Sequence, residues 1–295
     1  MIEVNSYFSG AGLMDIGLMD AGINIRQAFE LDVDACSTYR HNLGDHMKQC
    51  DITTELVLEQ DSCDGMAFTY PCTKYSTMAS IHGTRTGDDL FLHSLRHLAI
   101  AKPEFYVVEN VPGMKAFPVV MEVMTKLPDY HIQTFCPIKS ELWLPQRRDR
   151  LIIIGTKRNF TVRPPENTKP ISLESILEKD PKVTRPEAIK KRMEGGYRDL
   201  PIISDPRKGD IAPTAVAHYS KDKSTRLVKD KRFPMGVRPY SVREFARLQG
   251  VPDWFEFPGF DTAAYRQIGN GVSVPVGRWI GNELKRYFKK QRVAA

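Results

Sequence analysis

The sequence has few cysteines, and the five that it has are scattered, with no CxxC pair among them. An odd number without paired spacing supports neither a disulfide framework nor a zinc site, so we expect a reducing compartment and no bound metal. No apolar run approaches the length that a bilayer requires, and the N-terminus shows no basic leader followed by an apolar segment. We therefore expect a cytoplasmic monomer with no membrane partner.

Charge is unevenly distributed along the 295 residues, whose formal net charge is +6. The segment 179–232 holds 15 Lys and Arg against 8 Asp and Glu, whereas the rest of the chain is close to neutral, with 27 against 28. A basic segment of this kind is either a solvated surface or a surface that binds a polyanion, and charge alone does not separate the two. The wider stretch from about 156 to 238 is rich in Pro, Lys, Arg and Asp, and this change of composition predicts a separate, smaller module.

Strand-like and helix-compatible segments alternate through the first half of the chain. Strands are predicted at 2–7, 25–31, 65–70, 105–110, 131–136 and 150–155, with helical patterns between most of them. This alternation predicts an α/β fold with a mostly parallel, doubly wound sheet. Later, Ser241 with Glu244 predicts a capping box at the start of a helix, and a last helix is expected over about 276–290.

A set of residues near the N-terminus has the pattern of a nucleotide-binding site. A glycine-rich turn follows the first strand, and glycines there let a ligand approach the backbone and the N-terminus of the next helix. The second strand ends in a carboxylate, the position from which ribose hydroxyls are bound, and an Asp-Ile pair follows one element later. Each acidic residue alone is more often a surface charge, but the ordered set favours an adenosyl ligand. Its members are Phe8, Gly10, Ala11, Gly12, Glu30, Leu31, Asp51 and Ile52.

A second set of reactive side chains follows later strands of the predicted sheet. Cys72 comes directly after Pro71 at the end of one strand, and Glu109 lies at the end of the next. Arg148 and Arg150 lie at the start of another strand. A lone cysteine is usually a small buried hydrophobe, but a thiol, a carboxyl and two guanidinium groups at one sheet edge indicate an active site.

The chain resembles the C5 cytosine-specific DNA methyltransferase family in six motifs that occur in the family's order. They are FSGAGLMDIG at 8–17, YPCTKYS at 70–76, ENV at 109–111, QRRDRLIIIG at 146–155, RPYSVREFARLQGVPDWF at 238–255 and QIGNGVSVP at 267–275. The resemblance implies a Rossmann-like catalytic domain that binds S-adenosylmethionine over 1–176, a small basic target-recognition domain with its hinge over 177–260, and a C-terminal segment, 261–295, that completes the catalytic domain.

The resemblance also implies roles for individual residues. Cys72 matches the nucleophile that adds to C6 of a flipped-out cytosine, Glu109 the acid at N3, and Arg150 the contact to O2. Arg148 matches the supporting charge network and a DNA contact, and Ser76 a contact to the DNA backbone. The cofactor contacts implied in addition to the set above are Pro71, Asn270 and Val272.

The nucleophile loop departs from the family's usual Pro-Pro-Cys-Gln, because Tyr70 precedes Pro71 and Thr73 follows Cys72. Pro71 and Cys72 remain, so the chemistry is expected to be retained, while the shorter Thr73 changes how the loop can contact DNA. The predicted recognition region is short, which favours a short target sequence.

The expected function is a DNA methyltransferase of the restriction-modification, solitary or phage type. Three other functions are alternatives to it. An RNA methyltransferase of the transfer-RNA type usually carries a Cys-Phe-Thr segment, which is missing here. A non-catalytic DNA-binding relative is disfavoured by Cys72, Glu109 and Arg150. Dehydrogenase chemistry fits less well, because FSGAG lacks the dinucleotide glycine spacing. The expected partners are double-stranded DNA and a cognate restriction endonuclease.

Overall fold

The computed structural model describes residues 1–55, 63–71, 90–166, 168, 171–183, 187–195, 202–233 and 235–294. The chain forms two compact units. The first contains 1–138, 149–165 and 276–295, and the second contains 139–148 and 166–275. This division follows contacts within the chain, whereas the predicted division at 176 and 260 concerns function and stays a prediction.

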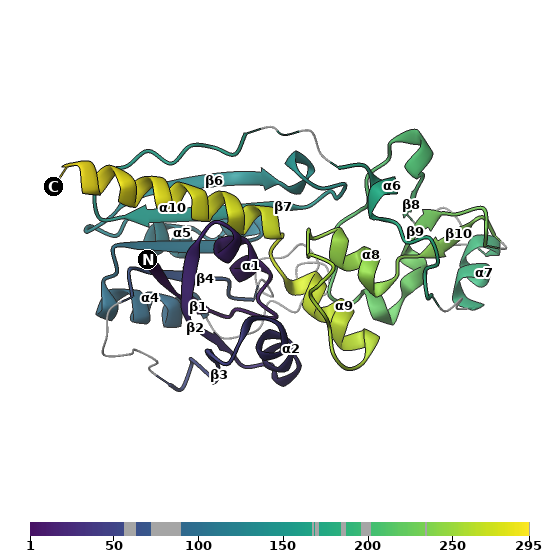
Figure 1. The fold of residues 1–295 in the computed structure, drawn as a ribbon, viewed down its shortest axis with the longest axis horizontal. Helices are drawn as coiled ribbons and strands as arrows, with labels where there is room; N and C mark the ends of the chain where they lie inside the picture. The colour runs from purple at the N-terminus through teal and green to yellow at the C-terminus, as the bar shows by residue number, and fades with distance from the viewer. Residues whose placement is uncertain are drawn as a thin grey trace. The chain divides into compact units, whose positions relative to one another are not determined.

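A seven-stranded sheet with the order β3-β2-β1-β4-β5-β7-β6 forms the centre of the first unit (Figure 1). The pairs among β1 to β5 are parallel, and β7 is antiparallel to β5. The mostly parallel sheet predicted from the alternating pattern is therefore confirmed. The strands are β1 Ile2–Tyr7, β2 Ile23–Glu30, β3 Met47–Gln49, β4 Gly65–Phe68, β5 Phe105–Asn110, β6 His131–Lys139 and β7 Asp149–Thr156.

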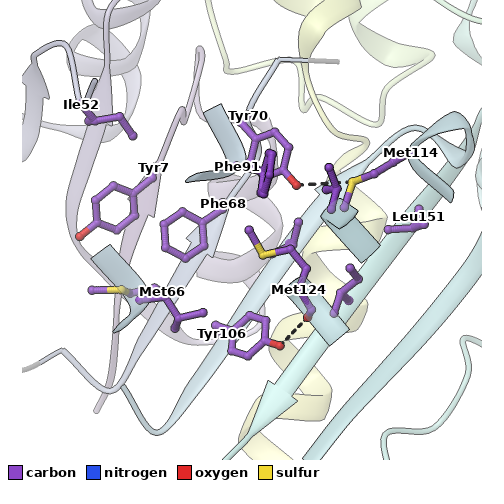
Figure 2. Close-up of a cluster of buried hydrophobic side chains, with 14 of the residues drawn as sticks. Tyr7, Ile52, Met66, Phe68, Tyr70, Phe91, Tyr106, Met114, Met124 and Leu151 are labelled. Carbon is purple, nitrogen blue, oxygen red and sulfur yellow. Dashed lines mark hydrogen bonds between the residues drawn. The ribbon is translucent and has the colours of Figure 1, made fainter. Parts of the chain in front are cut away.

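One face of this sheet is covered by α4 (Leu90–Ala101), the 3-10 turn η1 (Pro112–Ala116) and α5 (Pro118–Thr125). Figure 2 shows the buried cluster, in which aromatic and methionine side chains of the strands meet Phe91, Met114 and Met124. The hydroxyl groups of Tyr70 and Tyr106 are satisfied inside it, by Met114 Sδ at 3.4 Å and by the Met124 carbonyl at 2.8 Å. Burial of these large side chains is the main stabilising contribution on this face.

The opposite face carries α1 (Leu13–Asp20) and α10 (Val274–Ala294), with α2 (Val33–Leu43) following β2 (Figure 1). Phe105 alternates with Tyr106 along β5 and meets the Phe288 ring of α10, with ring centroids 5.9 Å apart. The two helices approach closely at glycine, because a Cβ on Gly277 would lie 2.3 Å from the Met14 carbonyl oxygen. The C-terminal helix is therefore an integral part of the first unit.

The second unit has a small sheet with the order β10-β9-β8 and several short helices. Its elements are α6 Leu173–Ile176, α7 Glu187–Glu194, β8 Ile202–Ser204, β9 Arg226–Lys229, β10 Val237–Pro239, α8 Val242–Arg247 and α9 Asp261–Asn270, with 3-10 turns at Ser140–Leu142, Pro206–Lys208, Tyr219–Lys221 and Lys223–Thr225. The predicted capping box of α8 is present: Ser241 Oγ accepts from the Glu244 amide, and Glu244 accepts from the Ser241 amide. None of the helices in the described parts of the chain is long and apolar enough to cross a membrane.

Candidate active site and cofactor site

The strand register brings the predicted site residues of the first unit to one edge of the sheet. Tyr7 pairs with Phe29 of β2 and with Phe68 of β4, and Phe68 pairs with Val108 of β5. Because these strands are parallel, the residues that follow lie at the same carboxyl edge, where open α/β sheets bind ligands. Those residues are Phe8, Glu30, Thr69 and Glu109.

The glycine-rich turn after β1 requires unusual backbone conformations. Phe8, Gly10 and Gly12 all have positive φ, at 58°, 56° and 88°. A Cβ on Gly12 would lie 2.5 Å from the Leu43 side chain, whereas a Cβ on Gly10 would meet nothing within 4 Å. Gly12 is thus needed for packing of the turn, and Gly10 leaves open space above the backbone, as a ligand-binding turn requires. Ala11 is buried between them.

A buried network of hydrogen bonds links the glycine-rich turn to α1 and α2. Asp15 of α1 accepts hydrogen bonds from Ser6 Oγ at 2.8 Å and from the Tyr39 hydroxyl at 3.0 Å, and Ser9 Oγ lies 3.0 Å from Ser6 Oγ. Burial raises the pKa of Asp15 to about 7, against the lowering effect of these two hydrogen bonds. Sequence reasoning missed Asp15, although a carboxylate within the apolar segment LMDIGLMD is a signal for such a network.

Glu30 is fixed in place by three backbone amides. Gly10 donates to its Oε2 at 2.8 Å, while Leu31 and Asp32 donate to its Oε1 at 2.8 and 2.9 Å. A carboxylate has about four acceptor positions, so this arrangement orients the group and leaves about one position, on Oε2, for a ribose hydroxyl. Leu31 is 59% exposed beside it and offers an apolar surface. The open space at Gly10 and the oriented carboxylate fit the ribose and adenine of S-adenosylmethionine.

The Asp-Ile pair lies in a tight turn after β3. Thr53 donates to Asp51 Oδ1 from its amide at 2.9 Å and from its hydroxyl at 2.7 Å. The Thr53 hydrogen bonds are the main cause that lowers the pKa of Asp51, so the group is ionised near neutral pH and can only accept hydrogen bonds. Ile52 is 4% exposed and joins the cluster in Figure 2. The Asp51 carboxylate is therefore a hydrogen-bond acceptor that the turn holds in one orientation.

Glu109 and Arg150, which the resemblance matches to two contacts with the cytosine, form an ion pair. Arg150 Nε lies 2.6 Å from Glu109 Oε1, and the two side chains are 12% and 8% exposed. Glu109 alternates with Tyr106 and Val108 in β5, so it projects from the face opposite the cluster of Figure 2. Since β7 is antiparallel to β5, Arg150 at the start of β7 reaches the same edge as Glu109 at the end of β5. An antiparallel strand therefore supplies its first residues where parallel strands supply their last.

Neighbouring polar contacts hold the segment that leads into the nucleophile motif. Asn110 Nδ2 donates to the Tyr70 carbonyl at 3.0 Å, and Thr69 Oγ1 donates to the Phe8 carbonyl at 2.8 Å. Pro71 follows as an exposed residue at this edge. Cys72 and Ser76 lie outside the described residues, so their predicted roles stay predictions.

The remaining predicted site residues lie in the second unit. Arg148 is 2% exposed and donates to the main-chain carbonyls of Ala215, Gly269 and Gly271, at 2.8, 3.0 and 2.7 Å. In the structure it therefore ties the QIGNG segment to another loop of its own unit, and a role toward DNA stays a prediction. Asn270 is exposed at the end of α9 and Val272 is buried. Their contact with a cofactor also stays a prediction.

Comparison with solved structures shows the fold over nearly the whole chain. A Dnmt2 mutant from Spodoptera frugiperda matches with a TM-score of 0.80 at 19% identity, covering 97% of this chain and 100% of the other. The methyltransferase EhMeth of Entamoeba histolytica matches with a TM-score of 0.78 at 18% identity, covering 98% and 99%. At these identities the likeness establishes a methyltransferase-type fold, which confirms the predicted fold class.

Sequence comparison identifies the family. The type II methyltransferase M.SsoII of Shigella sonnei is 30% identical over 94% of this chain and 78% of its own length, and M.NlaX of Neisseria lactamica is 27% identical over 97% and 96%. The family model for C-5 cytosine-specific DNA methylases matches residues 2–286. The chain therefore belongs to the C-5 cytosine-specific DNA methylase family and is an S-adenosylmethionine-dependent DNA cytosine-5 methyltransferase.

Proposed function

We propose that the carboxyl edge of the first unit's sheet is the catalytic centre, with Cys72 as the nucleophile and Glu109 and Arg150 as the groups that hold the cytosine. The observation that carries the proposal is the Glu109–Arg150 pair, 2.6 Å apart and partly accessible at the edge from which Pro71 leads into Cys72. A carboxyl and a guanidinium side by side match the N3, amino and O2 edge of cytosine, because the first can donate and accept while the second donates.

The reaction needs a nucleophile because C5 of cytosine is unreactive by itself. In the proposed mechanism the Cys72 thiolate forms a bond to C6, and the displaced electron pair spreads toward N3 and O2. Glu109 gives a proton to N3, while Arg150 donates to O2, so both stabilise the charge that the addition creates. When bound, S-adenosylmethionine supplies an electrophilic methyl group to C5. C5 then loses its proton to water, the bond from C6 to Cys72 breaks, and N3 returns its proton to Glu109.

The first unit also provides the residues that would hold the cofactor. Gly10 gives the close approach, Glu30 accepts from a ribose hydroxyl, and Asp51 accepts from the adenine amino group while Ile52 packs near the base. Phe8, Ala11, Gly12, Leu31 and Pro71 complete the proposed contacts in this unit. Asn270 and Val272 match the family's contacts to the methionine part, and this role stays a proposal.

We further propose that the basic segment in 177–260 recognises duplex DNA and supplies the binding energy that unstacks the target base. Flipping a nucleotide costs roughly a few kcal/mol, and 15 Lys and Arg between 179 and 232 can supply phosphate contacts. The type II methyltransferase relatives support a place in a restriction-modification system with a partner endonuclease.

Two measurements test this function. Bisulfite sequencing of DNA from cells that express the protein should show 5-methylcytosine at one short sequence, and the signal should vanish in Cys72→Ser. In a salt series, affinity for duplex DNA should exceed that for transfer RNA and fall steeply as salt rises, because phosphate contacts release counterions. Methyl transfer to transfer RNA but not to DNA would contradict the proposal.

A further inference from the structure

Arg96 is an arginine that the sequence motifs do not explain, and it binds the turn after β3 from a different element. It lies on α4, and its Nη2 donates to the Ile52 carbonyl at 2.9 Å and to the Glu55 carbonyl at 3.0 Å. The two acceptors are 44 and 41 residues away in sequence. A single guanidinium nitrogen thus binds two main-chain carbonyls of the turn 51–55.

The turn is closed by its own hydrogen bonds as well. The amides of Thr54 and Glu55 both donate to the Asp51 carbonyl, at 3.2 and 2.9 Å. These bonds close the turn locally, and the buried Ile52 side chain anchors it to the core. Arg96 adds a link to α4, whose Phe91 and Leu98 side chains are 5% and 2% exposed in the same cluster. The core and the rigid helix therefore together determine where the turn lies.

We infer that Arg96 is a positioning residue for cofactor recognition, holding Asp51 and Ile52 in the arrangement that distinguishes adenine from other bases. The inference rests on the proposed function, which assigns Asp51 and Ile52 to the adenine. Asp51 accepts from two groups of Thr53, which orients its carboxylate. An ionised carboxylate accepts from the 6-amino group of adenine and repels the 6-oxo group of hypoxanthine, so its exact position sets the selectivity between the two.

The test measures binding rather than turnover. Titration calorimetry with S-adenosylhomocysteine and with S-inosylhomocysteine gives the affinity for each base in the same protein. Arg96→Met keeps an unbranched, flexible stem but is shorter and removes the donors. We expect it to bind S-adenosylhomocysteine about tenfold more weakly, since a turn that is correctly placed only a tenth of the time lowers the apparent affinity by that factor. The ratio between the two ligands should fall toward one.

Two further variants sharpen the result. Arg96→Lys keeps a cation with hydrogen-bond donors, but its nitrogen lies one bond closer to the backbone than Arg96 Nη2 and cannot reach both carbonyls equally well, so its ligand ratio should lie between those of wild type and Arg96→Met. Arg278→Met removes an arginine of α10 that pairs with Asp20 at 2.6 Å, both about half exposed, and should leave the ratio unchanged. If Arg96→Met does not fold, the ratio in Arg96→Lys decides: a value below that of wild type supports the inference, and an unchanged value contradicts it.

The outcomes distinguish a wrong cofactor site from a wrong role for Arg96. If wild type binds neither ligand, the proposed cofactor site is wrong. If wild type prefers S-adenosylhomocysteine and Arg96→Met keeps the same affinity and ratio, the cofactor site stands and the role of Arg96 is wrong. Equal weakening of both ligands together with a lower melting temperature would show a purely structural role and would also overturn the inference.

Discussion

Each unit of the molecule contains a prominent arginine–glutamate pair, and the two pairs are built differently. Arg150 Nε lies 2.6 Å from Glu109 Oε1, and the two side chains keep 12% and 8% of their surface exposed. Arg238 and Glu244 are both fully buried. Arg238 binds both Glu244 oxygens at 2.7 and 2.8 Å and Asp230 at 2.7 Å, while Glu244 also caps α8 and accepts from the Glu178 amide.

In the proposed function the first pair takes part in the chemistry, whereas the second pair is structural. A pair buried from water is stable only if its donors and acceptors are well satisfied, as those of Arg238 and Glu244 are. A pair that is proposed to take up a substrate has to be reachable by it, and Arg150 keeps 12% of its side chain exposed. We therefore expect substitutions in the first pair to affect rate and those in the second to affect folding.

The largest effect should follow Glu109→Gln. Glutamine keeps the shape but has no proton to give to N3, so the turnover number should fall by about 10² to 10⁴. The free energy of unfolding should change less than in Arg238→Met, because the glutamine amide oxygen still accepts from Arg150, which keeps 12% of its side chain exposed. Single-turnover methyl transfer and urea unfolding measure the two quantities. A variant that is unfolded, or one that turns over at the wild-type rate, would remove the contrast between the pairs.

Arg238→Met should have the opposite profile. It leaves Glu244 buried without its cation, while Asp230 keeps its pair with Arg232, and the loss should cost about 3 to 5 kcal/mol of unfolding free energy. Replacing both Arg238 and Glu244 with methionine should recover part of that loss, and Arg278→Met, in an exposed pair, should cost about 0 to 1 kcal/mol. Urea titrations of the three variants make the comparison. A loss for Arg238→Met no larger than that for Arg278→Met would show that the buried pair is not a stability element.

Asp15 gives a pH-dependent effect of similar size. Its pKa is raised to about 7 by burial, whereas in the unfolded chain it is near 3.8. As pH rises from about 4 to 7 the unfolded chain releases this proton and the folded chain keeps it, so its contribution to unfolding free energy declines and is lost above about pH 7. The decline is at most about 4 kcal/mol, at about 1.4 kcal/mol per pKa unit.

The check is the difference in unfolding free energy between wild type and Asp15→Asn, measured from pH 5 to 8. The pKa of His97, which burial lowers, contributes equally to both proteins and cancels. His46 meets the same Tyr39 hydroxyl as Asp15, so the pair of proteins is also compared with His46→Gln in both. Wild type should lose stability relative to the variant as pH rises. A difference that stays constant with pH would mean that Asp15 is ionised in the folded protein.

The smallest effect concerns the cofactor. S-adenosylhomocysteine should raise the melting temperature of wild type by binding the native state, and Glu30→Ala should shrink that rise, because the ribose loses its acceptor. Thermal denaturation with and without millimolar ligand measures both. No rise in wild type would contradict the cofactor site, and an equal rise in Glu30→Ala would contradict the role of Glu30.

The sequence predicted most of the first unit because its signals are local. The strand at 2–7 and the glycine turn, like the Ser241–Glu244 cap in the second unit, each depend on neighbouring residues, and all are present. The small second sheet was not predicted, since β8 and β10 have three residues each and such a length carries no period. The partners of Asp15 lie 9 and 24 residues away, and the acceptors of Arg96 lie farther still, so only the folded chain reveals them.

The proposed mechanism depends most on Cys72 as the nucleophile, and covalent trapping tests this role most directly. In duplex DNA with 5-fluorocytosine at the target, the enzyme can add to C6, but fluorine cannot leave C5 as a proton does, so elimination is blocked and Cys72 stays attached. With cofactor present, wild type should give a complex that survives a denaturing gel and maps to Cys72, and Cys72→Ser should give none. A stable complex in Cys72→Ser, or one mapped to another residue, would contradict the mechanism.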